Sequence, residues 1–266
     1  MDCRAAYLIL PWRKDPMRHT RLNPLPATTP APVFPGLEMA SAWGELQYLV
    51  LPAGAQCGSS AAPDREVGYI LLGGAIDLEG PDLGAQFEGP TALLCGVGWP
   101  HTLANAGAGT AQLLRFSAAL QGNAPAAPTF RAESVDQARL KWRPAIHGGA
   151  GQIATRHIWG PGDFSSPWVF LDHAVLAPQS SLGYHYHDAL EECFVVLSGQ
   201  GYITISDQTL AVGPGSVTWQ GIGQPHGLYN SGGEPLDFLR VAVGIRGEQY
   251  TTIDLNDSLL KRKPSS

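Results

Sequence analysis

The chain has 266 residues, with 17 Lys and Arg against 23 Asp and Glu, which gives a formal net charge of −6. Only 15% of the residues are charged, so the composition lacks the basic footprint of a nucleic-acid binder. The 32 glycines and 22 prolines disfavour long helices, because in a helix interior proline costs about 3 kcal/mol and glycine about 1 kcal/mol. With 44% hydrophobic residues for a core, the composition favours many short strands joined by tight turns, an all-β class.

Residues 1–40 are predicted to form an extended, proline-rich arm, since seven prolines fall between positions 11 and 35. The apolar run Ala5–Leu10 is too short for a signal-peptide core or a membrane span. The cysteines form no C-x-x-C pair, which fits free thiols in a reducing compartment, and they are Cys3, Cys57, Cys95 and Cys193. We therefore expect a cytoplasmic protein, with a solvated basic tail at Lys261-Arg262-Lys263.

From residue 41 onward, short apolar runs alternate with turn residues. The runs expected to be strands of a first domain, over residues 41–120, are Leu46–Leu51, Val67–Leu72, Ala92–Cys95 and Ala111–Phe116. Residues 121–145 are predicted to be a linker. Within the linker, Glu133–Trp142 is predicted to be a helix of two to three turns.

The strand pattern then resumes in a second domain, predicted over residues 146–250. Its expected strands are Trp168–Val175, Cys193–Leu197, Tyr202–Ile205, Ser216–Trp219 and Phe238–Val243. A short helix is predicted near Asp254–Lys261, within a C-terminal tail of residues 251–266. Many short strands separated by glycine-rich turns are typical of a sandwich or barrel.

The two halves of the chain also resemble each other. Glu66-Val-Gly-Tyr-Ile-Leu-Leu-Gly73 aligns with Glu192-Cys-Phe-Val-Val-Leu-Ser-Gly199 at an offset of 126 residues. Trp99-Pro-His101-Thr-Leu-Ala-Asn105 aligns with Gln224-Pro-His226-Gly-Leu-Tyr-Asn230 at an offset of 125. Self-similarity over this distance indicates one domain written twice.

Four residues of the second half have the types and spacing of metal ligands. His185 and His187 are two apart, so on a strand their side chains share one face. Glu192 is expected to begin the next strand, and His226 to come from a later one. Three imidazole nitrogens and one carboxylate oxygen suit Fe(II), Mn(II), Ni(II), Co(II) or Zn(II) better than Ca or Mg. Four protein ligands leave one or two positions for water, O2 or substrate, as is typical of catalytic sites.

These residues resemble the two motifs of the cupin superfamily, G-x5-H-x-H-x3–4-E-x6-G and G-x5-P-x-G-x2-H-x3-N. The positions that fit are His185, His187, Glu192 and Gly199 for the first motif, and Gly215, Gly223, His226 and Asn230 for the second. Gln179 stands in place of the first glycine and Gly221 in place of the proline. The resemblance covers roughly residues 45–245. It implies a bicupin, two antiparallel jelly-roll barrels, with one metal held by His185, His187, Glu192 and His226.

Glu191 competes with Glu192 for the carboxylate position, because the first motif allows three or four residues before the glutamate. Six residues separate Glu192 from Gly199, as the motif requires, so Glu192 is favoured. Glu191 is then expected to face the opposite side of the strand.

The first half lacks most of this ligand set. Glu66 and His101 are expected to keep two ligand positions, but the H-x-H segment has become Ser59-Ser60-Ala61-Ala62. We therefore expect a degenerate N-terminal barrel kept for packing. A metal-free binding pocket that uses Glu66 and His101 remains the alternative.

Several side chains near the predicted centre are candidates for a substrate pocket or for ordinary barrel core, namely Phe194, Trp219 and Phe238. Tyr186 is a candidate for moving protons, although its parity places it on the face away from the two histidines. Arg240 is a candidate for clamping a substrate carboxylate, or for a surface ion pair with Asp237 or Glu234.

Three further histidines, His147, His157 and His173, lie outside the motifs, and structural or surface roles are expected for them. The glycine-rich run His147-Gly-Gly-Ala-Gly151 could lie over the barrel mouth. It does not fit a phosphate-binding loop, because it lacks the Lys-Ser/Thr ending.

The cupin resemblance favours an Fe(II) dioxygenase that brings a small organic substrate and O2 together. The second hypothesis is non-redox Lewis-acid chemistry with Zn, Mn or Ni: isomerisation, cyclisation, decarboxylation or hydrolysis. The third is a small-molecule binding or storage protein whose metal is structural. The partners expected are a small-molecule substrate and O2, with no nucleic acid and no membrane, and a homodimer is left open.

Overall fold

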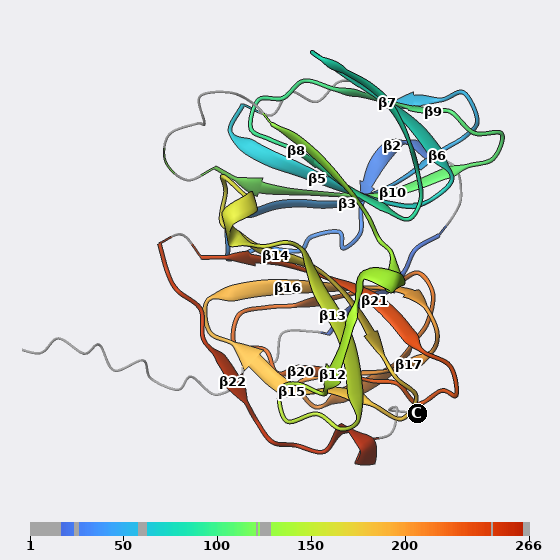
Figure 1. Cartoon of the computed structure of the whole chain (residues 1–266). Coiled ribbons are helices and arrows are strands. Elements are labelled where there is room, and N and C mark those ends of the chain that lie inside the picture. The colour runs from blue at the N-terminus through green and yellow to red at the C-terminus, as the bar shows by residue number, and fades with distance from the viewer. Residues whose placement is uncertain are drawn as a thin grey trace, which may run out of the picture.

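The computed structural model describes residues 17–23, 27–57, 63–120, 122, 129–245 and 247–262. Within these residues the chain is built from strands β1 to β22 and three short 3-10 helices. Figure 1 shows two β-barrels stacked one above the other, the upper from the N-terminal half and the lower from the C-terminal half. Cys3, Ala5–Leu10 and Ser59-Ser60-Ala61-Ala62 lie outside the described residues.

The upper barrel consists of two antiparallel sheets. Sheet B has six strands in the order β11 (Phe130–Ser134), β8 (Thr91–Cys95), β5 (Arg65–Gly73), β10 (Ala111–Ala119), β3 (Trp43–Leu51) and β2 (Ala27–Pro32). Sheet C has four strands in the order β4 (Gln56–Cys57), β9 (Thr102–Asn105), β6 (Ala75–Gly80) and β7 (Leu83–Glu88).

The lower barrel repeats this arrangement. Sheet A has seven strands in the order β1 (Arg18–Arg21), β19 (Ser216–Gln220), β16 (Leu190–Ser198), β21 (Leu236–Gly244), β14 (Trp168–Leu176), β13 (Gln152–Trp159) and β12 (Lys141–Pro144). Sheet D has five strands in the order β18 (Gln208–Val212), β17 (Gly201–Ile205), β20 (His226–Tyr229), β15 (Ser181–His187) and β22 (Thr252–Asp254). The all-β jelly-roll prediction is confirmed.

The predicted helix at Glu133–Trp142 is wrong. That stretch is the end of β11, the 3-10 helix η1 (Gln137–Arg139) and the start of β12. β11 adds an edge strand to the upper barrel and β12 adds one to the lower barrel, because pairing with a sheet edge satisfies backbone groups that a lone short helix leaves open. Near the C-terminus the predicted short helix is β22 followed by the 3-10 helix η3 (Leu259–Lys261), and η2 (Pro161–Asp163) precedes β14.

The described part of the N-terminal arm is also shared between the barrels. β1 pairs with β19 of the lower barrel, and β2 pairs with β3 of the upper one. The arm is extended, as the prolines predict, but it forms sheet edges.

Sheets A and B face each other between the two barrels, and the core there is apolar. Trp43, Leu46 and Phe116 of the upper barrel belong to the same buried cluster as Leu171 and Trp219 of the lower one. Each barrel has a separate core between its own two sheets. The central strands are therefore buried on both faces, so alternate residues of one strand serve two different cores.

Two buried carboxylates join the barrels, and each is held by the other barrel. Glu66 of β5 accepts hydrogen bonds from the backbone N–H groups of Ser165 (2.9 Å) and Ser166 (2.8 Å) and from the Ser166 hydroxyl (2.5 Å). Glu191 of β16 accepts the equivalent bonds from Ala40 N (3.0 Å), Ser41 N (3.0 Å) and the Ser41 hydroxyl (2.7 Å).

These reciprocal contacts correct the alignment of the halves. Glu66 corresponds to Glu191, not to Glu192, and the offset is 125 residues throughout. The turns agree, because Gly74 and Gly199 both have φ of 83°. A Cβ at either glycine would lie within 2.5 Å of a backbone oxygen, so both turns require glycine.

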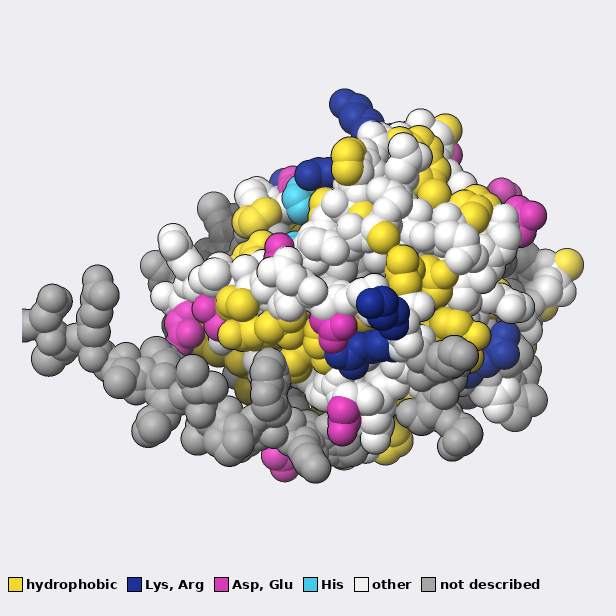
Figure 2. Space-filling model, turned by 90° about the horizontal axis from the view of Figure 1, so that it is seen from below, with side chains coloured by type: hydrophobic (Ala, Val, Ile, Leu, Met, Phe, Trp, Pro, Cys, Tyr) yellow, Lys and Arg dark blue, Asp and Glu magenta, His cyan; other side chains and the backbone are white. Residues whose placement is uncertain are grey.

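Figure 2 shows the molecule from the side of the lower barrel, where charged side chains are scattered among apolar and uncharged ones. Among the residues that the structure describes, no helix has the length and hydropathy needed to span a bilayer.

The first prediction concerns the carboxylates between the barrels. Replacing Glu66 by Gln removes a buried charge from three donors, and we expect the free energy of unfolding to fall by about 2 kcal/mol, since hydrogen bonds to charged groups contribute about 1.5–3 kcal/mol each and the amide keeps part of them. Urea unfolding measures the change. The matched control is Glu79→Gln at an exposed position of β6; equal loss in both variants would contradict the assignment.

Candidate metal centre

Three histidines and one glutamate meet inside the lower barrel. His185 and His187 come from β15, Glu192 from β16 and His226 from β20. All four side chains are at most 5% exposed. One ligand atom from each lies within 4.8 Å of the others, so the group could hold a metal ion.

The strand pairing explains this convergence. Residue 185 is paired directly with residue 226 across β15 and β20, and the i, i+2 spacing puts residue 187 on the same face. Glu192 alternates with Glu191 on β16, so one carboxylate faces the barrel interior while the other faces the upper barrel. As the motif spacing predicts, Glu192 lies with the histidines and Glu191 faces the opposite side of the strand.

Each imidazole is oriented by a bond on its outer nitrogen. His185 Nδ1 donates to the Gly183 carbonyl (2.8 Å), and His226 Nδ1 donates to the Gln224 carbonyl (2.9 Å). His187 Nδ1 lies 3.1 Å from the Thr252 hydroxyl. These bonds leave the Nε2 lone pairs of His185 and His226 for the centre, the arrangement that metal-binding histidines take in proteins.

The inner atoms are short of partners, which tests whether the residues fit a metal. His185 Nε2, His187 Nε2 and Glu192 Oε1 are buried with no hydrogen-bond partner. Glu192 Oε2 lies 3.1 Å from His226 Nε2 and 3.3 Å from His187 Nε2, the latter without hydrogen-bond geometry. Buried polar atoms that lack partners are costly, and a divalent cation held by these four side chains would satisfy the two imidazole nitrogens at once. The residues fit a transition metal.

The pKa values of the cluster favour the metal-binding protonation states. Burial, helped by the neighbouring histidines, lowers the pKa of His185 well below its usual value. Burial alone would raise the pKa of Glu192, but the adjacent imidazoles of His187 and His226 and the charge of Arg240 hold it well below the usual range. Both groups are therefore in the deprotonated form that a metal ligand needs.

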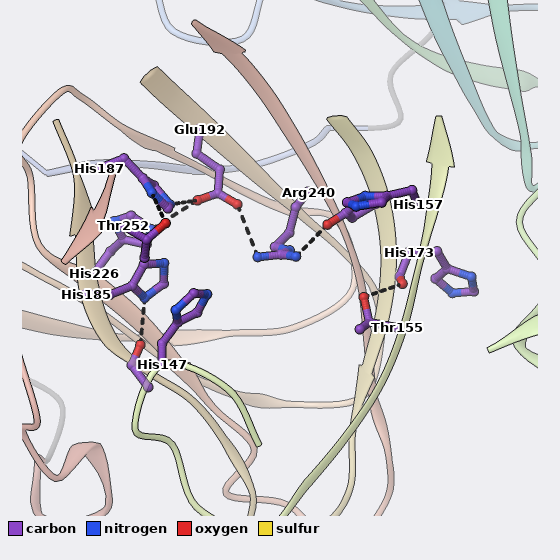
Figure 3. A network of polar contacts seen from close by, with 12 residues as sticks. His147, Thr155, His157, His173, His185, His187, Glu192, His226, Arg240 and Thr252 are labelled. Atoms are coloured by element: carbon purple, nitrogen blue, oxygen red, sulfur yellow. Dashed lines mark hydrogen bonds and ion pairs between the residues drawn. The ribbon is translucent and has the colours of Figure 1, made fainter. Parts of the chain in front are cut away.

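A loop and the C-terminal tail close round the cluster, and most of these contacts were missed from the sequence. His147 stacks on His185 with ring centroids 4.0 Å apart and reaches Asp254 Oδ1 at 3.0 Å. Figure 3 shows His147 beside His185. Tyr250 meets His187 edge-on at 5.8 Å. The predicted position of the 147–151 run near the barrel mouth agrees with this placement.

Glycine makes the close approach of this loop feasible. A Cβ at Gly183 would lie 1.8 Å from the His147 carbonyl oxygen, so β15 and the loop touch backbone to backbone. His147 itself has φ of 57°, a conformation that non-glycine residues rarely adopt. Nothing in the sequence motif signals this contact.

The other candidate residues fall in different places. Phe194 packs edge-on to His226 at 5.6 Å, and Phe238 lies behind it at 5.8 Å, so both form the fully buried floor of the barrel. Trp219 is not in the pocket, because its parity on β19 turns it to the core between the barrels, 4.5 Å from Trp43. Tyr186 alternates with the two histidines and lies half-buried on the opposite face of β15.

The expected surface ion pair of Arg240 with Asp237 or Glu234 is wrong. It lies inside the barrel, with Nη2 2.5 Å from Asp172 Oδ2 and Nη1 3.7 Å from Glu192 Oε1. Asp237 instead receives His173 Nε2 at 2.8 Å, which confirms a structural role for His173. His157 contacts Asp172 near the barrel mouth.

The upper barrel has lost its centre more fully than the sequence predicted. At the 125-residue offset Glu192 corresponds to Val67, and Glu66 is occupied between the barrels, so His101 alone remains of the described ligand positions. His101 Nε2 bonds the Tyr69 hydroxyl at 2.8 Å, and Nδ1 bonds the Trp99 carbonyl at 3.1 Å. The alternative prediction of a binding pocket that uses Glu66 and His101 is therefore wrong. The Tyr69 hydroxyl occupies the position at which His101 Nε2 would bind a metal.

The sequence of the lower barrel matches a known protein family. Residues 172–242, which include Glu192 and His226, match the family model described as a cupin domain. The lower barrel thus matches a cupin domain, and the two stacked jelly rolls give the chain the fold of a bicupin.

Relatives of this cupin include an oxalate-binding protein of Thermotoga maritima, 26% identical over 98 residues that make up 37% of this chain and 81% of that protein. AerE from Microcystis aeruginosa shares the fold with a TM-score of 0.57 at 14% identity, over 81% of this chain and 96% of that one.

Salicylate 1,2-dioxygenase from Pseudoaminobacter salicylatoxidans, in adducts with gentisate, has a TM-score of 0.61 at 10% identity, over 80% of this chain and 71% of that one. An oxalate decarboxylase variant from Bacillus subtilis has a TM-score of 0.56 at 13% identity, over 82% and 72%. At these identities the likeness concerns the fold.

The second prediction separates the two barrels. His187→Ala removes an inner ligand, so we expect metal affinity to fall by more than about 100-fold, beyond the range of an outer-partner change. His101→Ala leaves affinity near that of the unaltered protein, because His101 bonds Tyr69 in the other barrel. Isothermal titration calorimetry with Co(II) measures the metal affinity of both variants. Equal losses in the two variants would contradict a single centre.

The third prediction concerns pH. Because the pKa of His185 is lowered in the folded protein, the unfolded chain takes up a proton below pH 6.5 that the folded chain does not. The free energy of unfolding of metal-free protein should therefore fall as pH drops below about 6.5. The raised pKa of His157, due mainly to its bond with Asp172, acts in the opposite direction.

Urea unfolding at pH 7.5 and pH 5.5, with His185→Gln as the comparison, isolates the His185 contribution. The variant should lose less stability on acidification than the unaltered protein. An identical loss would show that His185 does not carry the effect.

Proposed function

We propose that this bicupin is a mononuclear metal-dependent enzyme, an Fe(II) dioxygenase-type oxidoreductase acting on a small organic molecule in the lower barrel. The observation that carries the proposal is the convergence of three imidazoles and one carboxylate, in which His185 Nε2, His187 Nε2 and Glu192 Oε1 lack hydrogen-bond partners. Four protein ligands leave coordination positions open, and imidazole with carboxylate is a ligand set that Fe(II) accepts. When bound, Fe(II) supplies the redox chemistry that activates O2 and substrate together.

The chain contributes orientation and enclosure. Gly183, Gln224 and Thr252 fix the three imidazole planes through their outer nitrogens. Phe194 and Phe238 close the barrel floor and keep water away from the far side of the centre. His147 and Tyr250 pack on His185 and His187, and we place the substrate entrance beside them.

A non-redox Lewis-acid enzyme using Zn, Mn or Ni is the second candidate. It is favoured by the 26% identity to a protein named for oxalate binding, since oxalate is a small chelating dicarboxylate. In either reaction Arg240 cannot act as a free carboxylate clamp, because its Nη2 is bonded to Asp172. The partners we propose are a small-molecule substrate and, for the oxygenase, O2.

The fourth prediction concerns the metal content of the protein and its consumption of oxygen. Protein purified without added metal should contain iron at about one atom per chain, in keeping with one complete ligand set. With Fe(II) restored, salicylate, gentisate and oxalate are offered as probe substrates in an oxygen electrode, with His187→Ala as control. Oxygen consumed together with a probe supports the oxygenase.

Turnover of a probe under argon would overturn the oxygenase in favour of the Lewis-acid enzyme. Zinc, nickel or manganese in the purified protein would point the same way. If removal of the metal lowers the melting temperature while no probe turns over in air or argon, the binding-protein hypothesis replaces both.

A further inference from the structure

A row of side chains with alternating charge crosses sheet A from the metal-ligand cluster to the barrel mouth. Its members are Glu192 on β16, Arg240 on β21, Asp172 on β14 and His157 on β13, and these four strands are consecutive neighbours in the sheet. Residue 240 pairs with residue 172, and residue 172 with residue 157, so three of the four side chains stand on one rung. Figure 3 shows the row running from Glu192 through Arg240 to His157.

The contacts along the row differ in closeness. Arg240 Nη2 donates to Asp172 Oδ2 at 2.5 Å, and the other oxygen of Asp172 bonds His157 Nδ1. On its other side, Arg240 Nη1 lies 3.7 Å from Glu192 Oε1, which has no hydrogen-bond partner. Arg240 is 6% exposed and Asp172 2% exposed, whereas the His157 side chain is 64% exposed. The Arg240 guanidinium is therefore bonded to Asp172 and lies farther from Glu192.

The two oxygens of Glu192 have different surroundings as a result. Oε2 faces His187 and His226, and Oε1 faces Arg240. We propose that Arg240, Asp172 and His157 position Glu192 so that its carboxylate meets the metal through Oε2 alone, which leaves to substrate the coordination position that a bidentate carboxylate would occupy. This inference rests on the metal centre of the proposed function.

The geometry explains why Asp172 is needed. A guanidinium in a dry interior binds a carboxylate in a two-pronged arrangement that takes both oxygens. Asp172 supplies a nearer negative charge and keeps Arg240 from closing on Glu192 in this way. His157 in turn donates to the outer oxygen of Asp172, and it packs with Arg240 against Phe170.

The upper barrel offers a comparison within the same chain. Arg115 stands at the position of Arg240, but the positions of Glu192, Asp172 and His157 hold Val67, Gln47 and Pro32. Arg115 bonds Gln47 Oε1 at 3.0 Å and pairs with Glu45. A buried arginine is therefore compatible with this barrel without the row, whereas the complete row occurs beside the complete ligand set.

Titration of Co(II) into the full-length protein tests the proposal through affinity and through the visible absorption of the bound ion. The intensity of Co(II) bands depends on coordination number, so it reports whether one or two carboxylate oxygens bind. In Asp172→Asn, Arg240 is released onto Glu192, and we expect affinity to fall about 10–100-fold with a changed spectrum. In His157→Ala the loss should be about tenfold with the same spectral change.

His157→Asn retains a donor near the place of Nδ1, so it should restore the spectrum of the unaltered protein. His19→Ala is the matched control, because His19 is a half-buried histidine on β1 that contacts Ser216 at 3.4 Å, away from the row. It should change neither affinity nor spectrum. A merely structural role for the row would lower the melting temperature without altering the spectrum of the bound ion.

If the unaltered protein binds Co(II), and His157→Ala and Asp172→Asn bind it with the same affinity and the same spectrum, the positioning role is wrong while the metal centre stands. If the unaltered protein binds no Co(II), the proposed function fails and the positioning role fails with it. The His157 side chain is largely exposed, so His157→Ala is expected to fold. It therefore tests the proposal even if Asp172→Asn does not fold.

Discussion

The central strands of sheet A are buried on both faces, and this constraint organises the rest of the molecule. One face packs against the upper barrel and the other lines the interior of the lower barrel. Because side chains alternate along a strand, a shift of one residue exchanges the two environments. Glu191 and Glu192 are neighbours in sequence, yet the first holds the barrels together and the second belongs to the candidate metal centre.

Burial on both faces also means that each charge in the sheet needs a partner. Glu191 has backbone and hydroxyl donors from the upper barrel, and Arg240 has Asp172. The inner atoms of His185, His187 and Glu192 are among the buried atoms that have no hydrogen-bond partner, and these three residues lie together with His226. In a close-packed interior such a deficit marks the place where a ligand completes the structure.

The metal-ligand cluster was predictable from the sequence because its determinants are local. His185 and His187 lie on one strand, Glu192 follows across a short turn, and His226 pairs directly with residue 185. The all-β class followed from glycine, proline and short apolar runs. The predictions that failed depended on a one-residue shift of strand register or on tertiary contacts. The offset of 126 placed Glu66 on the wrong face. The side of Trp219 was decided by packing between the barrels, and the 133–142 segment by strand pairing at the two sheet edges. His147, Asp172 and His157 come from segments far from the motifs, so no spacing rule could associate them with Glu192.

The reciprocal contacts of Glu66 and Glu191 suggest how such a chain arose. Each glutamate binds the loop before the equivalent strand of the opposite barrel, β14 for Glu66 and β3 for Glu191, so the contact from half one to half two repeats the contact from half two to half one. This is the form of an isologous interface, in which two identical subunits meet about a two-fold axis. A single-barrel ancestor that dimerised through this surface would have kept every one of these bonds when its gene was duplicated and fused. Once fused, the two copies no longer had to be identical, and one barrel could give up its metal ligands while still serving as the other's permanent partner.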